Sequence, residues 1–184
     1  MLGYTAMGVF LHMKNPTKEP QNMTPTHHKL PCRDREVVGN ELNTILAHLQ
    51  HLHLVTKQAH WNIRGDGFIG VHRLLDKIDA ELLEQIDESA ERVEALGIAA
   101  DATLEAIQKK SAIKNYPVGV RCIHTHLESL SAAYALVSEA GRRVIETADK
   151  HNDPGTADHV TGMTEQLDKW MWLIESNLPQ PKDA

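Results

Sequence analysis

The chain has 184 residues, which is enough for one domain with a hydrophobic core. Its formal net charge of −6 argues against a protein that coats nucleic acid over its whole surface, and it suits one that attracts cations. Only 4% of the residues are aromatic, which is typical of an all-helical protein, and no long apolar run predicts a membrane-spanning helix.

The N-terminus and the cysteines indicate a cytoplasmic protein. The first residues lack the basic region that precedes the apolar core of a signal peptide. Cys32 and Cys122 form no CxxC motif, so we interpret them as thiols of a reducing compartment. A single disulfide between them stays open at this stage.

Residues 1–33 are predicted to form a flexible N-terminal tail. They hold four of the eight prolines, and no helical period survives there. The segment is mildly basic, because its one acidic residue, Glu19, is outnumbered by four cationic residues: Lys14, Lys18, Lys29 and Arg33.

Apolar residues then recur at spacings of three and four, which predicts a helix over residues 34–63. His60 lies near the end of this helix. The following glycines match the pattern GxGxxG over residues 65–70, but no strand precedes them, so we interpret them as a turn between two helices.

A second helix is predicted over residues 68–96, where Gly97 is a natural stop. Residues 98–116 are predicted to form a connection with a short helix over 103–109. Pro117 is predicted to open a third helix that runs to residue 150. A turn over residues 153–156 then leads to a fourth helix over 157–177.

These elements predict an all-α fold, a four-helix bundle over residues 34–178 with one long crossover between its second and third helices. Residues 179–184 are left as a short C-terminal tail.

Five of the histidines and acids between residues 60 and 91 form a candidate ligand set, because iron, manganese and zinc accept imidazole and carboxylate ligands. Four of them are spaced so that they lie on one stripe of the second helix. The candidate catalytic and metal-binding residues are His60, His72, Asp76, Asp87 and Glu91.

One helix cannot bring these side chains to one metal. Asp76 and Asp87 are separated by about 16 Å along a helix axis, whereas metal–ligand bonds are about 2 Å long. A two-fold axis that crosses the helix between Glu81 and Leu82 would place Asp76 opposite Asp87 of a second copy, and His72 opposite Glu91. We therefore predict metal sites that are shared between two subunits.

The spacing alone leaves an alternative open, which is a structural helical bundle whose acidic stripe is only a solvated face. Bundles that hold two irons inside one subunit use Glu-x-x-His motifs, and this chain has none. Any ferritin-like site here must be built differently.

The segment from Thr56 to Gly97 resembles the Dps family, the miniferritins also called DNA-binding proteins from starved cells. The likeness rests on HWN at 60–62, on VH at 71–72 with Asp76 four residues later, and on the D-x-x-x-E of 87–91. It continues through KNYPVG at 114–119 and LDKWMWLIESN at 167–177, and it covers roughly residues 36–178.

This resemblance implies a ferritin-like subunit that assembles into a hollow dodecamer with two ferroxidase centres at each two-fold interface. Each centre would hold two irons, with Zn or Mn as substitutes. It would take His60, His72 and Asp76 from one subunit, and Asp87 and Glu91 from its partner. Family members oxidise Fe²⁺, preferentially with hydrogen peroxide rather than O₂, and store the ferric mineral.

The resemblance and the spacing also place other side chains. Near the site we expect Lys57, His53, Trp61 and Trp172. Mineral nucleation would fall to Glu81, Glu84 and Glu88, because Arg73 and Lys77 are basic where several relatives have acids. The candidates for an iron-entry pore are Asp149, Asp153 and Asp158.

A second hypothesis is a nucleoid-associated protein that binds and compacts DNA and whose metal is incidental. The tail has few lysines and the body is acidic, so we expect DNA binding to be weak near neutral pH.

Overall fold

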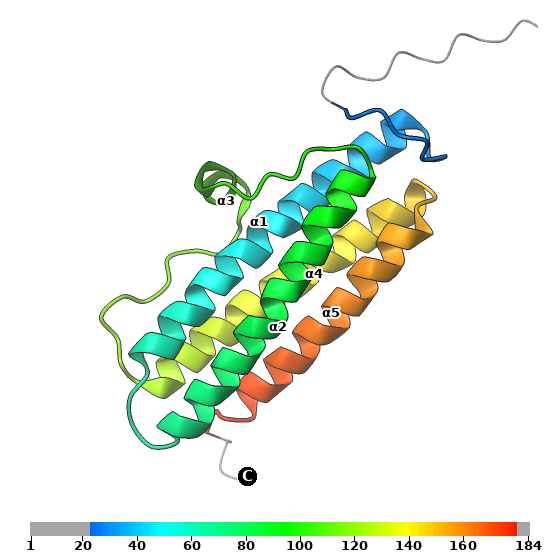
Figure 1. Cartoon of the computed structure of the whole chain (residues 1–184). Helices are drawn as coiled ribbons and strands as arrows, with labels where there is room; N and C mark the ends of the chain where they lie inside the picture. Colours follow the sequence, from blue (N-terminus) through cyan, green and yellow to red (C-terminus); the bar gives the residue numbers. More distant parts are fainter. Residues whose placement is uncertain (1–22, 180–184) are drawn as a thin grey trace, which may run out of the picture.

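The computed structural model describes residues 23–179, and it forms four long helices side by side with a fifth, short helix beside them (Figure 1). Within this range no β-strand forms. The helices are α1 (Cys32–Asn62), α2 (Phe68–Ala95), α3 (Leu104–Lys110), α4 (Ile123–Lys150) and α5 (Pro154–Glu175). The predicted all-α bundle is confirmed, and none of the described helices is long and apolar enough to span a membrane.

The crossover determines how the four helices run. Short connections join α1 to α2 and α4 to α5, so each of these pairs is antiparallel (Figure 1). The connection from α2 to α4 travels the length of the bundle and carries α3, so α2 and α4 are parallel (Figure 1). This is the long-crossover form of a four-helix bundle.

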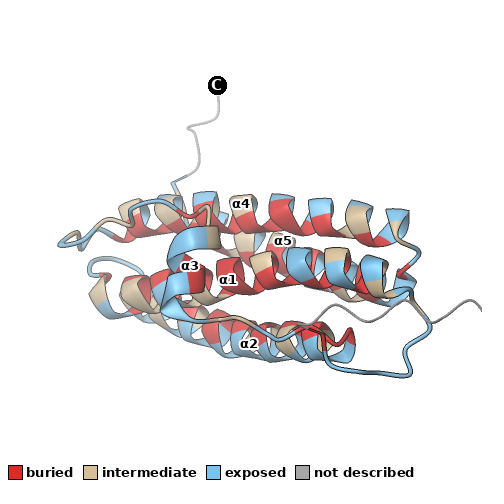
Figure 2. Ribbon diagram, turned by 90° about the horizontal axis from the view of Figure 1, so that it is seen from above, coloured by how far each residue is buried: buried red, intermediate tan, exposed pale blue. Residues whose placement is uncertain are grey.

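The apolar stripes of the long helices meet inside the bundle, where Figure 2 shows the buried residues facing inward. Leu42, Leu82, Leu130 and Leu167, one from each long helix, are fully buried. Each such side chain contributes about 1.5–3 kcal/mol when it leaves water. The spacing of three and four residues therefore places each helix by its apolar face.

The bundle begins earlier than predicted. Helix α1 starts at Cys32, and the described residues just before it lie against the bundle: Met23 is buried, and the Thr24 amide donates to the Gly97 carbonyl at 2.9 Å. The rest of the predicted tail lies outside the described residues. Cys32 and Cys122 are not joined by a disulfide.

Gly97 ends α2 as predicted, with a φ of 78°. The buried Arg35 guanidinium donates to the carbonyl of Leu96 at 2.7 Å, which places a cation at the negative end of the α2 dipole. A Cβ on Gly97 would lie 2.8 Å from this guanidinium and 2.7 Å from the Thr24 carbonyl oxygen. The stop therefore needs glycine for its conformation and for the space around it.

The prediction that Pro117 opens the third helix is wrong. Helix α4 begins at Ile123, six residues later along the chain. The Arg121 carbonyl accepts from the Arg64 amide at 2.8 Å, and the Val120 carbonyl accepts from the buried His126 ring at 3.0 Å. These contacts hold residues 120 and 121 in an extended path across the end of the bundle.

The predicted turn over residues 153–156 is also wrong, because α5 already begins at Pro154. The Asp153 side chain accepts from the Thr156 amide at 3.1 Å, as an N-cap residue does, and proline suits the first helical position. The turn is confined to the residues between Lys150 and Pro154.

Histidines of α1 hold the crossover against the bundle. The Ala112 amide donates to His48 Nε2 at 3.3 Å, and the His51 ring lies 2.9 Å from the Ser111 hydroxyl. His48 Nδ1 is already 2.6 Å from the Thr44 carbonyl, so it must donate there and leave Nε2 as an acceptor. The crossover is thus attached through a neutral histidine.

We expect acidification below about pH 6.5 to release the crossover. Burial lowers the pKa of His48 and that of His51, and the Arg143 charge lowers that of His48 further. Between the lowered pKa and the ordinary value of about 6.5, the unfolded chain binds more protons than the folded one, so stability falls as the pH falls. The protection factor of the Ala112 amide in hydrogen exchange should drop across this range. His48→Gln should remove most of this dependence, and an unchanged pH profile in that variant would contradict the assignment.

Replacing Gly141 should destabilise the bundle, because a Cβ there would lie 2.5 Å from Thr164 Cγ2 and force α4 away from α5. We expect Gly141→Ala to cost about 1–3 kcal/mol in the free energy of unfolding, measured by denaturant titration. Gly162→Ala is the matched control, since a Cβ there meets nothing within 4 Å, and it should stabilise by about 0.5–1 kcal/mol. Equal effects of the two substitutions would contradict this account of the packing.

Candidate metal centre

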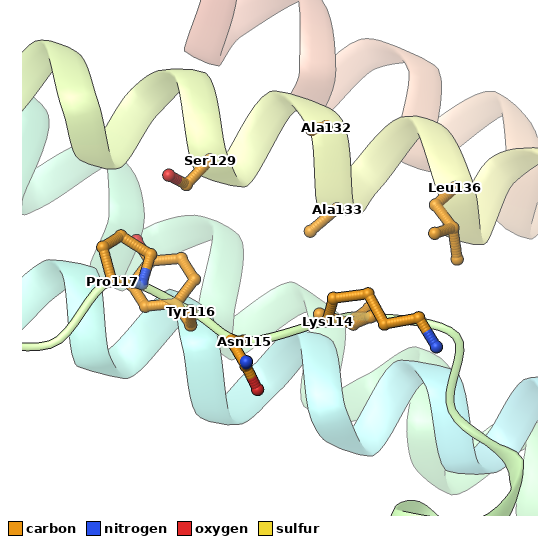
Figure 3. A pocket seen from close by; sticks show the side chains of 9 residues that line it. Lys114, Asn115, Tyr116, Pro117, Ser129, Ala132, Ala133 and Leu136 are labelled. Atoms are coloured by element: carbon orange, nitrogen blue, oxygen red, sulfur yellow. The ribbon is translucent and has the colours of Figure 1, made fainter.

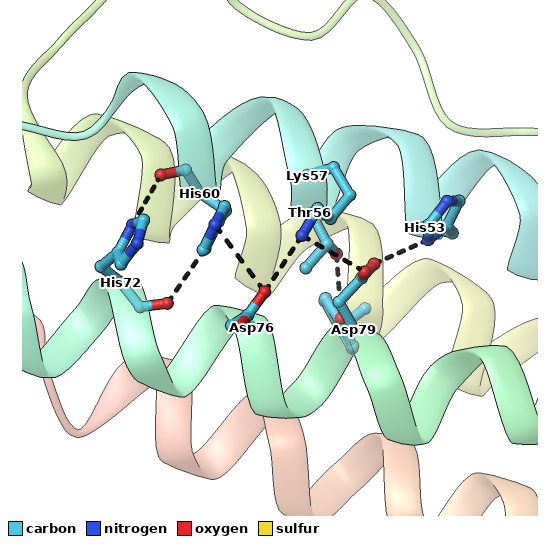
Figure 4. A network of polar contacts seen from close by, with 8 residues as sticks. His53, Thr56, Lys57, His60, His72, Asp76 and Asp79 are labelled. Carbon is cyan, nitrogen blue, oxygen red and sulfur yellow. Dashed lines mark hydrogen bonds and ion pairs between the residues drawn. The ribbon is translucent and has the colours of Figure 1, made fainter.

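Two of the predicted ligands meet where α1 ends and α2 begins. The rings of His60 and His72 stack with centroids 3.8 Å apart and planes 18° from parallel. The connection of residues 63–67 reverses the chain, so His60 on the last turn of α1 faces His72 in the second turn of α2 (Figure 4). The structure thus brings these two candidate ligands together.

Each of these histidines holds the backbone beside the other. His60 Nδ1 is 3.0 Å from the His72 carbonyl oxygen, and His72 Nδ1 is 3.1 Å from the His60 carbonyl oxygen. A carbonyl only accepts, so both Nδ1 atoms carry the proton and both Nε2 atoms of the neutral rings keep a lone pair. A ring whose other nitrogen donates to a carbonyl is the usual form of a metal-binding histidine.

Asp76 completes the cluster on α2. Its Oδ1 lies 3.7 Å from His60 Nε2 and 3.1 Å from Lys57 Nζ, and its side chain is largely exposed (Figure 4). The hydrogen bond from Lys57, with the charge of that ammonium, lowers the pKa of the Asp76 carboxyl. Lys57, which was expected near the site, therefore pairs with a candidate ligand.

Asp87 and Glu91 stay apart from this cluster. Both are exposed on α2, about three to five turns beyond His72 and Asp76. Among the described residues, no three His, Cys, Asp or Glu side chains are placed so that they could hold one metal ion. One chain thus presents two incomplete sets of ligands, one where α1 meets α2 and one farther along α2. The two neutral imidazoles with a carboxylate are a donor set that suits a divalent transition metal.

A buried polar group beside the cluster was not predicted from the sequence. Asp79 is 5% exposed and accepts from His53 Nδ1 at 2.7 Å, with Lys57 3.7 Å from its other oxygen. A carboxylate on the apolar side of α2, one turn after Asp76, was the available signal. Its partner His53 lies on another helix, so the pairing itself depends on the packing.

The two tryptophans that were expected near the site have different surroundings. Trp61 is 61% exposed, and Lys57 Nζ lies 5.9 Å from its ring centroid. Trp172 is 63% exposed on α5, and no described contact joins it to the cluster. The buried tryptophan is Trp170, which donates to Glu81 at 2.8 Å.

The predicted nucleation residues line one hollow between α2 and α5, of about 490 Å³. Glu81 also accepts from Gln166 at 3.2 Å, so its carboxylate is already engaged, whereas Glu84 and Glu88 are exposed. The pKa of His159 on the same wall is lowered, chiefly by burial.

The three pore candidates also differ in whether their carboxylates are exposed or already engaged in other contacts. Asp149 and Asp158 are exposed. Asp153 is buried, caps α5 and pairs with Arg92 at 2.7 Å. Its carboxylate therefore holds the start of α5 in place rather than facing a channel.

A second hollow, of about 310 Å³, lies between the crossover and α4 (Figure 3). Tyr116, Pro117 and Leu136 make much of its lining, and none of the candidate ligands reaches it. It belongs to the packing of the crossover rather than to the metal centre.

Comparisons with known proteins give one family. The model of the ferritin-like domain matches residues 39–182. A DNA protection during starvation protein of Agrobacterium fabrum is 39% identical over 155 residues, which cover 84% of this chain and 96% of that protein. A fine tangled pili major subunit of Haemophilus ducreyi is 32% identical over 88% of this chain and 89% of its own length.

The solved structures agree with the sequence relatives. DpsC from Streptomyces coelicolor superposes with a TM-score of 0.82 at 27% identity, over 89% of this chain and 96% of that one. The overall fold of this chain is therefore shared with a solved Dps structure. The chain belongs to the Dps family of ferritin-like proteins, as its residues 56–97 indicated.

Proposed function

We propose that this protein is a ferroxidase that oxidises Fe²⁺, preferentially with hydrogen peroxide, and stores the ferric product inside a hollow dodecamer. The site would be shared between two copies. His60, His72 and Asp76 would come from one copy, and Asp87 and Glu91 from the other.

The reciprocal hydrogen bonds of His60 and His72 are the observation that carries this proposal. They commit both Nδ1 atoms to carbonyl oxygens at 3.0 and 3.1 Å, so the two rings present Nε2 lone pairs without further rearrangement. Both rings thus have the tautomer that metal-binding histidines usually adopt, in which the other ring nitrogen donates to a carbonyl. The arrangement is ready for a cation that Asp76 would help to neutralise.

A second copy is expected to cover the face that carries these residues. Leu83 is 45% exposed on α2, two turns beyond Asp76, and Trp61 and Leu54 are exposed two turns apart on the neighbouring face of α1. Exposed apolar side chains grouped on one face favour an interface between proteins. An antiparallel copy of α2 across this face would place Asp87 and Glu91 beside the histidines.

The chemistry follows from the donor set. Carboxylates favour the harder ferric ion, and so lower the Fe(III)/Fe(II) potential of bound iron. Two Fe²⁺ ions at one site can give one electron each to hydrogen peroxide, which takes up two protons and leaves as two water molecules. Paired delivery avoids the hydroxyl radical that one-electron reduction would release, and this would protect the cell. Zn or Mn would occupy the site without this turnover.

The acidic hollow between α2 and α5 is the candidate site for mineral nucleation. Glu84 and Glu88 are exposed there and would nucleate the ferric mineral, while Asp149 and Asp158 remain as exposed pore candidates. Glu81 is already hydrogen-bonded to Trp170 and Gln166, so we assign it a structural part.

Removing the partner's ligands should abolish rapid oxidation. We expect the Asp87→Ala/Glu91→Ala variant to oxidise Fe²⁺ at least about tenfold more slowly, since loss of these groups leaves only half of each site. The measurement is anaerobic loading with Fe²⁺ followed by peroxide, with ferric absorbance as the readout. Glu36→Ala/Glu41→Ala removes two exposed carboxylates of α1 and is the matched control. If wild type is no faster than the Asp87→Ala/Glu91→Ala variant, the ferroxidase proposal is wrong.

The competing hypothesis is a DNA-compacting protein, and its test follows from the charge. We expect DNA to be retarded in gels only at low salt, because the net charge is −6 and phosphate contacts weaken steeply with salt. Met23 is packed in the core, so the tail is tested by deleting residues 1–22 rather than 1–33. Tight binding at physiological salt that this deletion abolishes would favour the DNA-compacting hypothesis instead.

A further inference from the structure

Lys57 lies between two carboxylates of α2 that differ in their surroundings. Its ammonium is 3.1 Å from Asp76 Oδ1 and 3.7 Å from Asp79 Oδ2 (Figure 4). The Asp76 side chain is 63% exposed, whereas that of Asp79 is 7% exposed. The Lys57 ammonium therefore lies between an exposed carboxylate at the candidate metal centre, here called the open carboxylate, and a buried one beside it, here called the closed carboxylate.

The closed carboxylate is held in a fixed orientation. His53 donates from Nδ1 to Asp79 Oδ1 at 2.7 Å, which leaves Oδ2 turned toward Lys57. A buried carboxylate is costly unless it is paired, so Asp79 keeps a strong attraction for a neighbouring ammonium. The Trp61 ring, 5.9 Å from Lys57 Nζ, adds a cation–π contact.

Asp76, the open carboxylate, would have to bind Lys57 in the empty site and the metal ion in the filled site. Asp76 Oδ1 faces His60 Nε2 at 3.7 Å and accepts from Lys57 at 3.1 Å, so the ammonium stands where an incoming Fe²⁺ would need the same oxygen. The Lys57 ammonium and a metal ion that shared one carboxylate oxygen would lie so close together that their positive charges would repel each other strongly. Binding of the metal therefore requires that Lys57 leave Asp76, and Asp79 is the carboxylate within its reach.

We propose that Asp79, oriented by His53, is a positioning residue that accepts Lys57 when a metal ion displaces it from Asp76. Lys57 would then act as an internal counter-ion, which neutralises Asp76 in the empty site and moves less than a side-chain length when the site fills. This inference rests on the proposed metal centre, and it assigns to His53, Lys57 and Asp79 a common effect on metal affinity.

The test measures Co²⁺ binding to the full-length protein at fixed pH. The two readouts are calorimetry and the visible spectrum of bound Co²⁺. Lys57→Gln should tighten the Co²⁺ dissociation constant roughly tenfold, because the competing cation is gone. Asp79→Asn should weaken it roughly tenfold, because Lys57 then has only Asp76. The double variant should bind like Lys57→Gln alone.

This double-mutant cycle separates positioning from ordinary packing. If Asp79 acts through Lys57, its substitution has no effect once Lys57 is removed. If the pair only ties α1 to α2, the two effects add, or Lys57→Gln fails to tighten binding, and the inference is overturned. Lys77→Gln is the matched control, since Lys77 is next to Asp76 in sequence but lies 3.6 Å from Glu81 and is mostly exposed. It should shift the constant by less than about twofold, as a screened surface charge does.

Two further variants keep the test decisive. Should Asp79→Asn fail to fold, His53→Gln takes its place, because it leaves Asp79 without its orienting hydrogen bond. It should weaken Co²⁺ binding in the presence of Lys57 and have no effect without it, and any other result counts against the inference. Asp87→Ala tests the proposed centre itself. If it binds Co²⁺ as wild type does, the shared site is wrong. If it loses Co²⁺ while Lys57→Gln matches wild type, only the present inference fails.

Discussion

A straight helix holds Asp76 and Asp87 about 16 Å apart, and no motion of the side chains can close that distance. The proposed chemistry depends on this constraint, because three of the five candidate ligands lie where α1 meets α2 and the other two lie farther along α2. The described structure keeps them divided, with His60, His72 and Asp76 at one end and the carboxylates of residues 87 and 91 at the other. The proposed site therefore requires a second copy of the chain, and it would link metal binding to oligomerisation.

The end of α1 shows how backbone and site are built together. The His60 carbonyl lies in the last turn, where a helix leaves its carbonyls without partners, and the His72 ring supplies a donor at 3.1 Å. The same bond sets the tautomer of His72. Termination of one helix, alignment of the next and preparation of the imidazoles therefore result from one pair of side chains.

Polar groups inside the α1–α2 and α1–α4 contacts are paired throughout the described chain, with no buried side-chain nitrogen or oxygen left without a partner. The Thr56 hydroxyl meets the buried Tyr134 hydroxyl at 3.0 Å, and His53 meets Asp79 at 2.7 Å. Such pairs discriminate between alternative packings, since a shifted helix would leave each of them unsatisfied. These two pairs fix the position of α1 along α2 and α4, and in this position Lys57 reaches Asp76.

The sequence by itself determined the class of the fold, the extent of α2, the stop at Gly97 and the five candidate ligands, because helical spacing and ligand chemistry are local properties. It also showed that Asp76 and Asp87 of one chain cannot bind the same metal ion, since the rise of a helix is constant. Only the tertiary structure decided where α4 begins, because the Arg121 carbonyl accepts from Arg64, which is distant in the sequence. The start of α5 follows a local pattern, an Asp N-cap before a proline, and the prediction of a turn over residues 153–156 overlooked it. The pairing of Asp79 with His53 and Lys57 likewise depends on how α1 lies against α2, and a contact between residues 26 positions apart has no signature in local spacing.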